Sequence, residues 1–353
     1  MECRETAEAM ATAASRLLGA LTGAQREKIC FDFADEAQRR DWSFLPVPER
    51  LGLQLGELDD GQRKLAHELI AAGTSMPGYA KVVSVIAMEH VLRALTMATQ
   101  PDVARRLFDP GRYSLKMFGT PGDAGAWGWQ IAGHHVSLNY TVAGGRYVSP
   151  TPMLLGSQPS SFGTLAPLSD DEELGYRFVS SLDDAQRKAA VIHHRPPPDL
   201  ATRIVPRIGD VERPDPVFAP EPGYVIDDAE RDILSYVRHG PKGVPGHALN
   251  AGQLGELEAL VAAFTGRMPD DVAAAQLRLI GEAGLENLWF AWAGDTAPGG
   301  RHYFRVQGPV LLIEHDNTQD NGRHIHSAWR NPVDDFGDDL LGAHLLREHG
   351  LPS

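Results

Sequence analysis

The chain has 353 residues, a formal net charge of −14 and a hydrophobic content of 42%. It is long enough for one large or two medium-sized globular domains. Nonspecific binding to nucleic acid depends on a basic surface, so the negative charge argues against a nucleic-acid partner. No run approaches the roughly 20 consecutive apolar residues that span a bilayer, so no membrane partner is expected.

The first residues and the cysteines indicate a compartment. Acidic residues come early, without a basic region followed by an apolar stretch, so the N-terminus does not resemble a secretory signal. Only Cys3 and Cys30 are present, which excludes a disulfide scaffold and an all-cysteine zinc site. We therefore expect a cytoplasmic, reducing environment.

The first half of the chain predicts helices followed by an antiparallel meander. Residues 1–20 are expected to form an N-terminal tail. Apolar residues then recur at helical spacing from Gln62 to Ala72 and from Tyr79 to Arg93. Strand-forming runs follow, separated by glycine-containing turns, the first of them at Ala132 and Gly133; these runs cover residues 127–131, 134–141 and 146–149. Residues 21–151 are therefore expected to form one helix-plus-meander repeat.

The second half repeats this order after a connection over residues 152–181. Residues 182–349 are expected to form the second repeat, with strands over 301–306, 309–316 and 324–329. A proline-rich insertion at 195–223 contains eight prolines, which remove backbone donors and prevent a helix from continuing. This insertion is expected to be an extended surface connection, or alternatively a lid over a site.

Four sequence matches, all in the same order, indicate an internal duplication. The pairs are 21–26 with 182–187, 58–62 with 249–253, Met76-Pro77 with Met268-Pro269, and 118–139 with 293–314. The last pair aligns without a gap, because Gly119 and Gly133 are as far apart as Gly294 and Gly308. We therefore predict an α+β fold of two degenerate repeats, each with helices followed by an antiparallel β-meander, that form one compact pseudo-twofold unit.

A cluster of imidazoles and carboxylates near the C-terminus predicts a metal site. Three histidines and three acidic residues fall within residues 314–326. If the chain is extended at Ile325, the side chains of His324 and His326 share one face and can bind one ion. Such a pair can also be a polar edge strand or two solvated histidines. Imidazoles suit copper, iron or zinc, and the sequence does not distinguish between these transition metals.

A second histidine pair, His134 and His135, lies in the first meander. On a continuous strand His135 shares a polar face with Ser137 and Asn139, whereas His134 lies on the other face. Strand parity therefore favours His135 as a ligand. His134 remains a candidate ligand, because a β-bulge would reverse the parity.

The same parity rule selects the acidic candidates of the second meander. Glu314 and Asp316 share one face of their predicted strand, and His315 lies on the other. Either of the two carboxylates is expected to be the acidic partner of the histidines.

Taken together, these motifs resemble the DUF3500 family over roughly residues 20–349. The matching segments are Ala-Trp-Gly-Trp at 126–129, Gly-His-His-Val-Ser-Leu-Asn at 133–139, Glu-His-Asp-Asn-Thr-Gln at 314–319, His-Ile-His-Ser-Ala-Trp-Arg at 324–330 and Asp-Phe-Gly-Asp-Asp-Leu-Leu at 335–341. The resemblance supplies a residue pattern that includes His344, and little chemistry. It implies an aromatic residue where this chain has His315, which weakens His315 as a ligand.

The preferred functional hypothesis is a metal-dependent oxidase or oxygenase that acts on a small polar metabolite. His135, His324 and His326 are the expected imidazole ligands, with Glu314 or Asp316 beside them. Asn139 is expected to orient the substrate. Arg330 can hold a substrate carboxylate through its planar guanidinium, or can pair with one of the nearby aspartates at 334, 335 and 338. The oligomeric state is not predicted.

Other function classes remain open. One alternative is a metal-dependent hydrolase of a small molecule, and a metal-free hydrolase with Ser137 as nucleophile is weaker because no nucleophile-elbow motif is present. Another is a non-catalytic metal- or ligand-binding protein. Its cleft would be lined by tryptophans that can equally be core residues, namely Trp127, Trp129, Trp289 and Trp292.

Overall fold

The computed structural model describes residues 2–122, 124–215 and 224–342. The structure is mixed α+β, with helices and a large mixed sheet of 13 strands. Contacts divide the chain into two units. Unit 1 comprises residues 1–154, 265–276 and 333–353, and unit 2 comprises residues 155–264 and 277–332. His344 lies outside the described residues.

In unit 1, the helices α1–α6 precede the strands β3–β6, and the short strands β1 and β2 lie between helices. The helices are α1 (Arg4–Ala20), α2 (Gly23–Ile29), α3 (Glu36–Arg39), α4 (Asp60–Gly73), α5 (Met76–Met97) and α6 (Pro101–Leu107), with 3-10 turns at η1 (Leu55–Glu57), η2 (Pro110–Arg112) and η5 (Asp335–Gly337). The strands are β1 (Cys30–Phe31), β2 (Leu53–Gln54), β3 (Ser114–Phe118), β4 (Ala126–Gly133), β5 (Val136–Ala143) and β6 (Tyr147–Ser149).

The expected N-terminal tail is the helix α1. Its buried face includes Ala7, Met10 and Leu17, and the indole nitrogen of Trp129 lies 3.2 Å from the sulfur of Met10. Residues 4–20 therefore belong to the packed part of unit 1.

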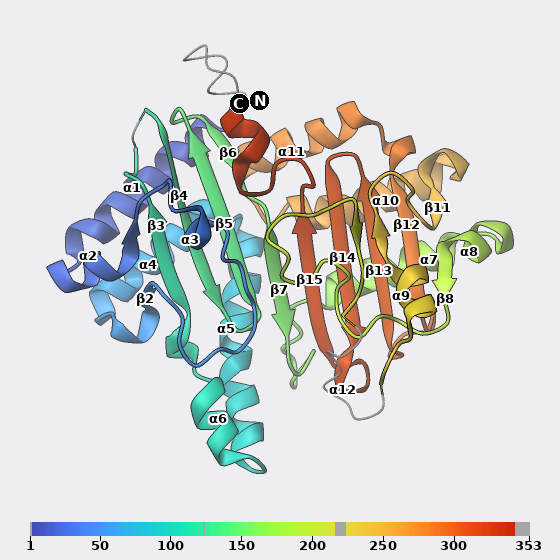
Figure 1. The fold of residues 1–353 in the computed structure, drawn as a ribbon, viewed down its shortest axis with the longest axis horizontal. Helices are drawn as coiled ribbons and strands as arrows, with labels where there is room; N and C mark the ends of the chain where they lie inside the picture. Colours follow the sequence, from blue (N-terminus) through green and yellow to red (C-terminus); the bar gives the residue numbers. More distant parts are fainter. Residues whose placement is uncertain (1, 123, 216–223, 343–353) are drawn as a thin grey trace. The chain divides into compact units, whose positions relative to one another are not determined.

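The sheet of unit 1 has helices on one face and irregular chain on the other. Its strands follow the order β1-β3-β4-β5, with β1 parallel to β3 and the other neighbours antiparallel. Figure 1 shows α1, α4 and α5 behind β3–β5 and the short α3 in front of them. Trp129 and Tyr140 stack on the helical face, where the Tyr140 hydroxyl donates to the carbonyl of Gly73 on α4.

Unit 2 contains a second antiparallel meander with its own helices. The helices are α7 (Ser169–Ser181), α8 (Asp184–Ala190), α9 (Asp228–Leu234) and α12 (Gln319–Gly322), with 3-10 turns at η3 (Gly246–Ala248) and η4 (Leu285–Asn287). The strands are β8 (Val191–His193), β9 (Val211–Glu212), β10 (Tyr236–Val237), β11 (Val244–Pro245), β12 (Trp289–Gly294), β13 (His302–Gly308), β14 (Leu311–Thr318) and β15 (His324–Arg330). Three further elements contain the division between the units: β7 (Met153–Ser157), α10 (Ala251–Thr265) and α11 (Asp270–Ala283).

The strands of unit 2 are covered on both faces. They follow the order β15-β14-β13-β12-β11, and each neighbour is antiparallel. Gly175 of α7 packs against the ring of Phe304 on one face, whereas Leu234 of α9 and Tyr303 belong to a core cluster on the other. Figure 1 shows α7 behind this meander and α9, with the preceding extended chain, in front of it.

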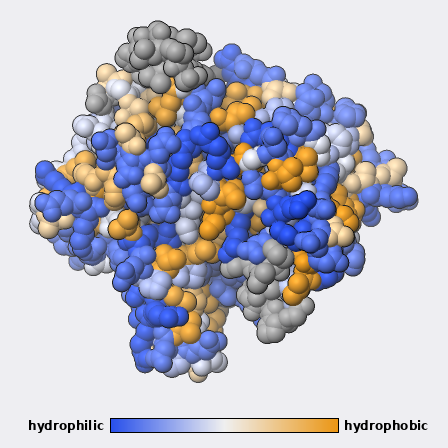
Figure 2. All heavy atoms as spheres, in the orientation of Figure 1, coloured by the Kyte–Doolittle hydropathy of each residue, from blue (hydrophilic) through white to orange (hydrophobic). Residues whose placement is uncertain are grey.

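Most of the surface in view is hydrophilic. Figure 2 shows hydrophilic residues over much of the face drawn, with smaller hydrophobic groups among them. This surface agrees with a chain that carries a formal charge of −14.

The first hairpin corrects one sequence-based prediction. The expected strand over 134–141 begins two residues later, because His134 and His135 form the turn between β4 and β5. Gly133, expected in the turn, ends β4, where a Cβ would lie 2.2 Å from the ring of Tyr113. The left-handed position of the turn falls instead on His135, whose φ is 66°.

Candidate functional site

The two histidines of β15 lie on one face of the unit 2 sheet. Because β15 is extended, the side chains of His324 and His326 point the same way, and their ring centroids are 4.7 Å apart. Asp316 of β14 is the cross-strand partner of His326, so its side chain lies on this face too. All three side chains are buried.

The proline-rich insertion covers this face and supplies a residue that the sequence analysis did not select. Asp199, one residue after three consecutive prolines, places Oδ1 2.8 Å from Nδ1 of His326. Asp199 and its prolines are buried, so this part of the insertion is not a surface connection. The alternative of a lid over a site stays a prediction, and residues 216–223 of the insertion lie outside the described part of the chain.

Glu314, the first acidic candidate, fastens the insertion to the sheet. Its Oε1 accepts hydrogen bonds from the backbone N–H of Ala201 and the hydroxyl of Tyr303, each at 2.7 Å. Its Oε2 accepts from the backbone N–H of Thr202 at 3.2 Å and from the hydroxyl of the same residue. A carboxylate with four neutral donors holds the chain over 201–202 in place.

Asp316, the second acidic candidate, sits in a cluster of negative charge. Burial and the charge of Asp199 raise the pKa of the Asp316 carboxyl well above its ordinary value, and Glu314 adds to the effect. The hydroxyl of Thr318 donates to Asp316 Oδ1 at 2.6 Å and opposes that rise. The same face also carries two buried guanidinium groups, since Arg305 is the cross-strand partner of Glu314 and Arg330 alternates with His326 along β15.

A tight turn positions His324. Asp320, Asn321 and Gly322 all have positive φ, which reverses the chain between β14 and β15. The backbone N–H of His324 donates to the side-chain oxygen of Asn317 at 3.1 Å, and its Nδ1 lies 3.7 Å from a carboxylate oxygen of Asp320. The start of β15 is thus tied to β14 by a side chain as well as by the strand ladder.

The histidine pair of unit 1 is also buried and ordered by contacts. His134 places Nδ1 2.8 Å from Oε2 of the buried Glu89 on α5, and its ring stacks on Phe108. The rings of His134 and His135 stack with centroids 3.8 Å apart. A cavity of about 10 Å³, roughly the space of one water molecule, is lined by Glu89, His134 and Tyr113 among others.

Asn139 lies on β5 within a polar network of unit 1. Its amide nitrogen donates to the carbonyl of Pro152 at 2.7 Å and to the hydroxyl of Ser137 at 3.3 Å, and its oxygen accepts from Gln130 at 2.5 Å. These contacts fix the orientation of the amide.

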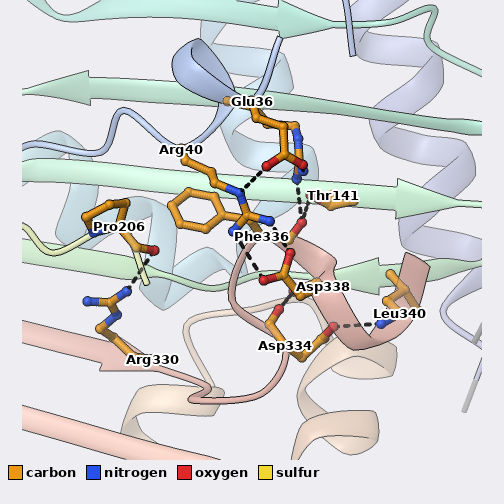
Figure 3. Close-up of polar contacts among 11 residues, drawn as sticks. Glu36, Arg40, Thr141, Pro206, Arg330, Asp334, Phe336, Asp338 and Leu340 are labelled. Carbon is orange, nitrogen blue, oxygen red and sulfur yellow. Dashed lines mark hydrogen bonds and ion pairs between the residues drawn. The ribbon is translucent and has the colours of Figure 1, made fainter. Parts of the chain in front are cut away.

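Arg330 ends β15 and is fully buried. Its guanidinium donates to the carbonyl oxygens of Val205 at 2.8 Å and Pro206 at 3.4 Å, as Figure 3 shows for Pro206. These hydrogen bonds hold the proline-rich insertion at a second place, Val205 and Pro206. The aspartates named as possible partners belong to unit 1, where Asp338 binds Arg40, and Arg40 also binds Glu36 (Figure 3).

The tryptophans and Ser137 occupy the interior. Trp127, Trp129 and Trp292 are fully buried, which fits the core interpretation of these residues. Ser137 is buried within β5 and accepts a hydrogen bond from Asn139.

One group of buried side chains that lies entirely within unit 2 could hold a metal ion, namely Asp199, Asp316 and His326. One oxygen of Asp199, Oδ2, is buried and accepts no hydrogen bond from the described residues, which is consistent with a ligand atom.

Among the described residues, no helix is long and apolar enough to cross a membrane.

A family model with the description "Protein of unknown function (DUF3500)" matches residues 3–338. Neither the curated proteins nor the solved structures contain a match.

Proposed function

The chain belongs to the DUF3500 family, and we propose that it is a metal-dependent oxidase or oxygenase that acts on a small polar metabolite. The observation that supports this proposal most is the position of two buried imidazoles, His324 and His326, on one face with the buried carboxylates of Asp199 and Asp316. Buried imidazoles that share a face are a common way to bind a transition metal.

His324 and His326 would hold the ion, and His135 is the third proposed ligand, with His134 as its alternative. The proposal for His135 has one independent support in unit 1. A non-glycine residue at φ 66° is strained, and such strain is concentrated at functional sites. A bound copper or iron ion would supply one-electron redox chemistry, and a zinc ion would supply a Lewis acid.

The remaining residues would prepare the site for substrate. Glu314 and Arg330 hold the insertion over the sheet and thereby exclude water from this face. The fixed amide of Asn139 is proposed to orient polar groups of the substrate. Arg330 is also proposed to bind a substrate carboxylate through its planar guanidinium.

Metal analysis tests the proposal directly. Plasma mass spectrometry of the untagged protein should find near-stoichiometric copper, iron or zinc, and the His324→Ala/His326→Ala variant should lose it. The matched control is His239→Ala/His247→Ala, because both of these histidines are exposed. Absence of metal from the wild type after anaerobic reconstitution would contradict the proposal and favour a metal-free binding protein.

Hydrolysis is the second candidate function. It is favoured over oxidation if the bound metal is zinc, because zinc has no redox chemistry. Screening the metal-loaded protein for oxygen consumption and for ester or amide hydrolysis separates the two reactions. A metal-loaded protein with neither activity would support a non-catalytic metal-binding role.

We also propose that the two units arose by duplication. In unit 1 the Gln25 amide donates to the carbonyl of Glu57 and the side chain of Gln62. In unit 2 the Gln186 amide makes the same bonds to Ala248 and Gln253.

The hairpins support the same proposal. β5 covers residues 136–143 and β14 covers 311–318, a constant shift of 175 residues. A crystal structure in which β3–β5 superpose on β12–β14 at this shift is the expected result, and another best register would contradict it.

A further inference from the structure

We propose that unit 2 binds a second metal ion at Asp199, Asp316 and His326, beside the imidazole site. One ligand atom from each of these residues lies within 4.8 Å of the others. Ligand atoms at about 2.0–2.3 Å from an ion are at most about 4.6 Å apart. The three atoms therefore need only a small movement to converge on one ion. The inference rests on the proposed function only because the two sites share His326.

The proposed ligands are shielded from solvent. Asp199, Glu314 and Asp316 are at most 1% exposed and lie on the same face of the sheet. Buried guanidinium groups share this face, because Arg305 is the cross-strand partner of Glu314 and Arg330 alternates with His326 along β15, and Nε of Arg203 lies 3.5 Å from Asp199 Oδ2. The support for an ion therefore comes from the burial and the convergence of the ligand atoms and not from an excess of negative charge.

The hydrogen bonds distinguish the proposed metal ligands from Glu314, which supports the site. All four donors around Glu314 come from the covering chain or from Tyr303, so Glu314 is saturated and acts as an anchor. Asp199 differs, because its Oδ2 is buried and accepts no hydrogen bond from the described residues. That oxygen is available for a metal.

The orientation of His326 allows both sites to exist. Its Nδ1 faces Asp199 at 2.8 Å, so this nitrogen belongs to the carboxylate side. The proposal assigns the other ring nitrogen, Nε2, to the ion of the imidazole site. An ion bound at Nδ1 takes the place of the proton between Nδ1 and Oδ1, and that proton is released to solvent.

The ligand set indicates the class of metal. Two carboxylates and one imidazole form a harder site than three imidazoles do. Carboxylates suit manganese, and a single imidazole is compatible with it, so Mn²⁺ is the appropriate probe. Copper is expected to prefer the imidazole site.

Manganese titration of the copper-loaded protein, followed by electron paramagnetic resonance, tests this inference. The wild type should bind one equivalent of Mn²⁺ and should show dipolar broadening of the copper signal. Asp199→Asn and Asp316→Asn should each weaken Mn²⁺ binding by about tenfold or more. The control Asp228→Asn changes an aspartate that is 91% exposed and should bind Mn²⁺ like the wild type.

The outcomes separate this inference from the proposed function. Copper binding without one equivalent of bound Mn²⁺ would overturn the second site alone. Mn²⁺ binding that survives both asparagine substitutions would also overturn it. If Asp316→Asn fails to fold, two other variants still test the manganese site. They are Asp199→Asn and the metal-free His324→Ala protein. His324→Ala should lose copper and keep Mn²⁺.

Discussion

Nδ1 of His326 lies 2.8 Å from the carboxylate of Asp199, and 127 residues of sequence separate the two. A carboxylate at one ring nitrogen fixes the orientation of the imidazole and directs the other nitrogen to a ligand. The proline-rich insertion therefore does more than connect two segments. It contributes a charged side chain to the face that carries the candidate site.

The anchoring role of Glu314 gives the first prediction. Glu314→Gln keeps the size of the side chain but places an NH₂ group among donors that need an acceptor. We expect a loss of about 2–3 kcal/mol in the free energy of unfolding and faster proteolysis near residues 203–213. Urea denaturation and limited proteolysis measure these effects.

The exposed Glu258→Gln is the control for that experiment and should leave both quantities unchanged. If Glu314→Gln is as stable and as protease-resistant as the wild type, the hydrogen bonds of Glu314 do not hold the insertion.

Much of the fold could be predicted from local patterns, and the first hairpin shows where such prediction ends. The order of helices and meanders follows from apolar spacing and from cap residues such as Asp59, whose side chain accepts from the backbone of Gln62. The turn was placed at Gly133 because glycine usually occupies the left-handed position of a turn. Here the glycine is required by the ring of Tyr113, a contact that the sequence does not reveal.

The candidate site was predicted only in part for a similar reason. His324 and His326 could be assigned to one face of their strand, and Glu314 and Asp316 to one face of theirs, because strand alternation is a local rule. Asp199 could not, since its place depends on how the insertion folds back across β14 and β15. The run of three prolines before Asp199 was the available signal, because it indicates a rigid segment as well as a linker.

The backbone of His135 gives the second prediction. Asparagine tolerates a φ of 66°, whereas a β-branched residue does not. The free energy of unfolding of metal-free His135→Asn should therefore lie within about 1 kcal/mol of the wild-type value. His135→Val should be less stable than His135→Asn by about 1–2 kcal/mol. Both variants should bind less metal than the wild type if His135 is a ligand.

Equilibrium unfolding of the metal-free proteins and metal analysis of the loaded ones provide the two readouts. Equal stability of the asparagine and valine variants would argue against the left-handed backbone. Full metal content in both would remove His135 from the ligand set and leave His134 as the alternative.

Arg330 gives the third prediction. Lysine keeps the charge but cannot reach two carbonyl oxygens with a planar fork. Arg330→Lys should lower the free energy of unfolding by about 1–3 kcal/mol, because the part-buried hydrogen bonds to the carbonyl oxygens of Val205 and Pro206 lose their donor. Arg207→Lys changes an exposed arginine of the same insertion and should have no effect. A stable Arg330→Lys with weakened substrate binding would instead assign Arg330 to the substrate.

The last prediction concerns His302, which makes the stability acid-sensitive without any metal. Its ring is fully buried and stacks on Trp292 with centroids 5.0 Å apart, and burial lowers its pKa from 6.5 to about 4. As the pH falls below 6.5, the unfolded chain takes up the proton first, so the free energy of unfolding decreases until about pH 4, by on the order of 3 kcal/mol. His302→Phe keeps the stack and removes the titrating group, so its urea midpoint should fall less between pH 7 and pH 4.5 than that of the wild type. His239→Phe, at a position that is 80% exposed, should keep the wild-type slope, and an unchanged slope in His302→Phe would assign the acid sensitivity to other groups.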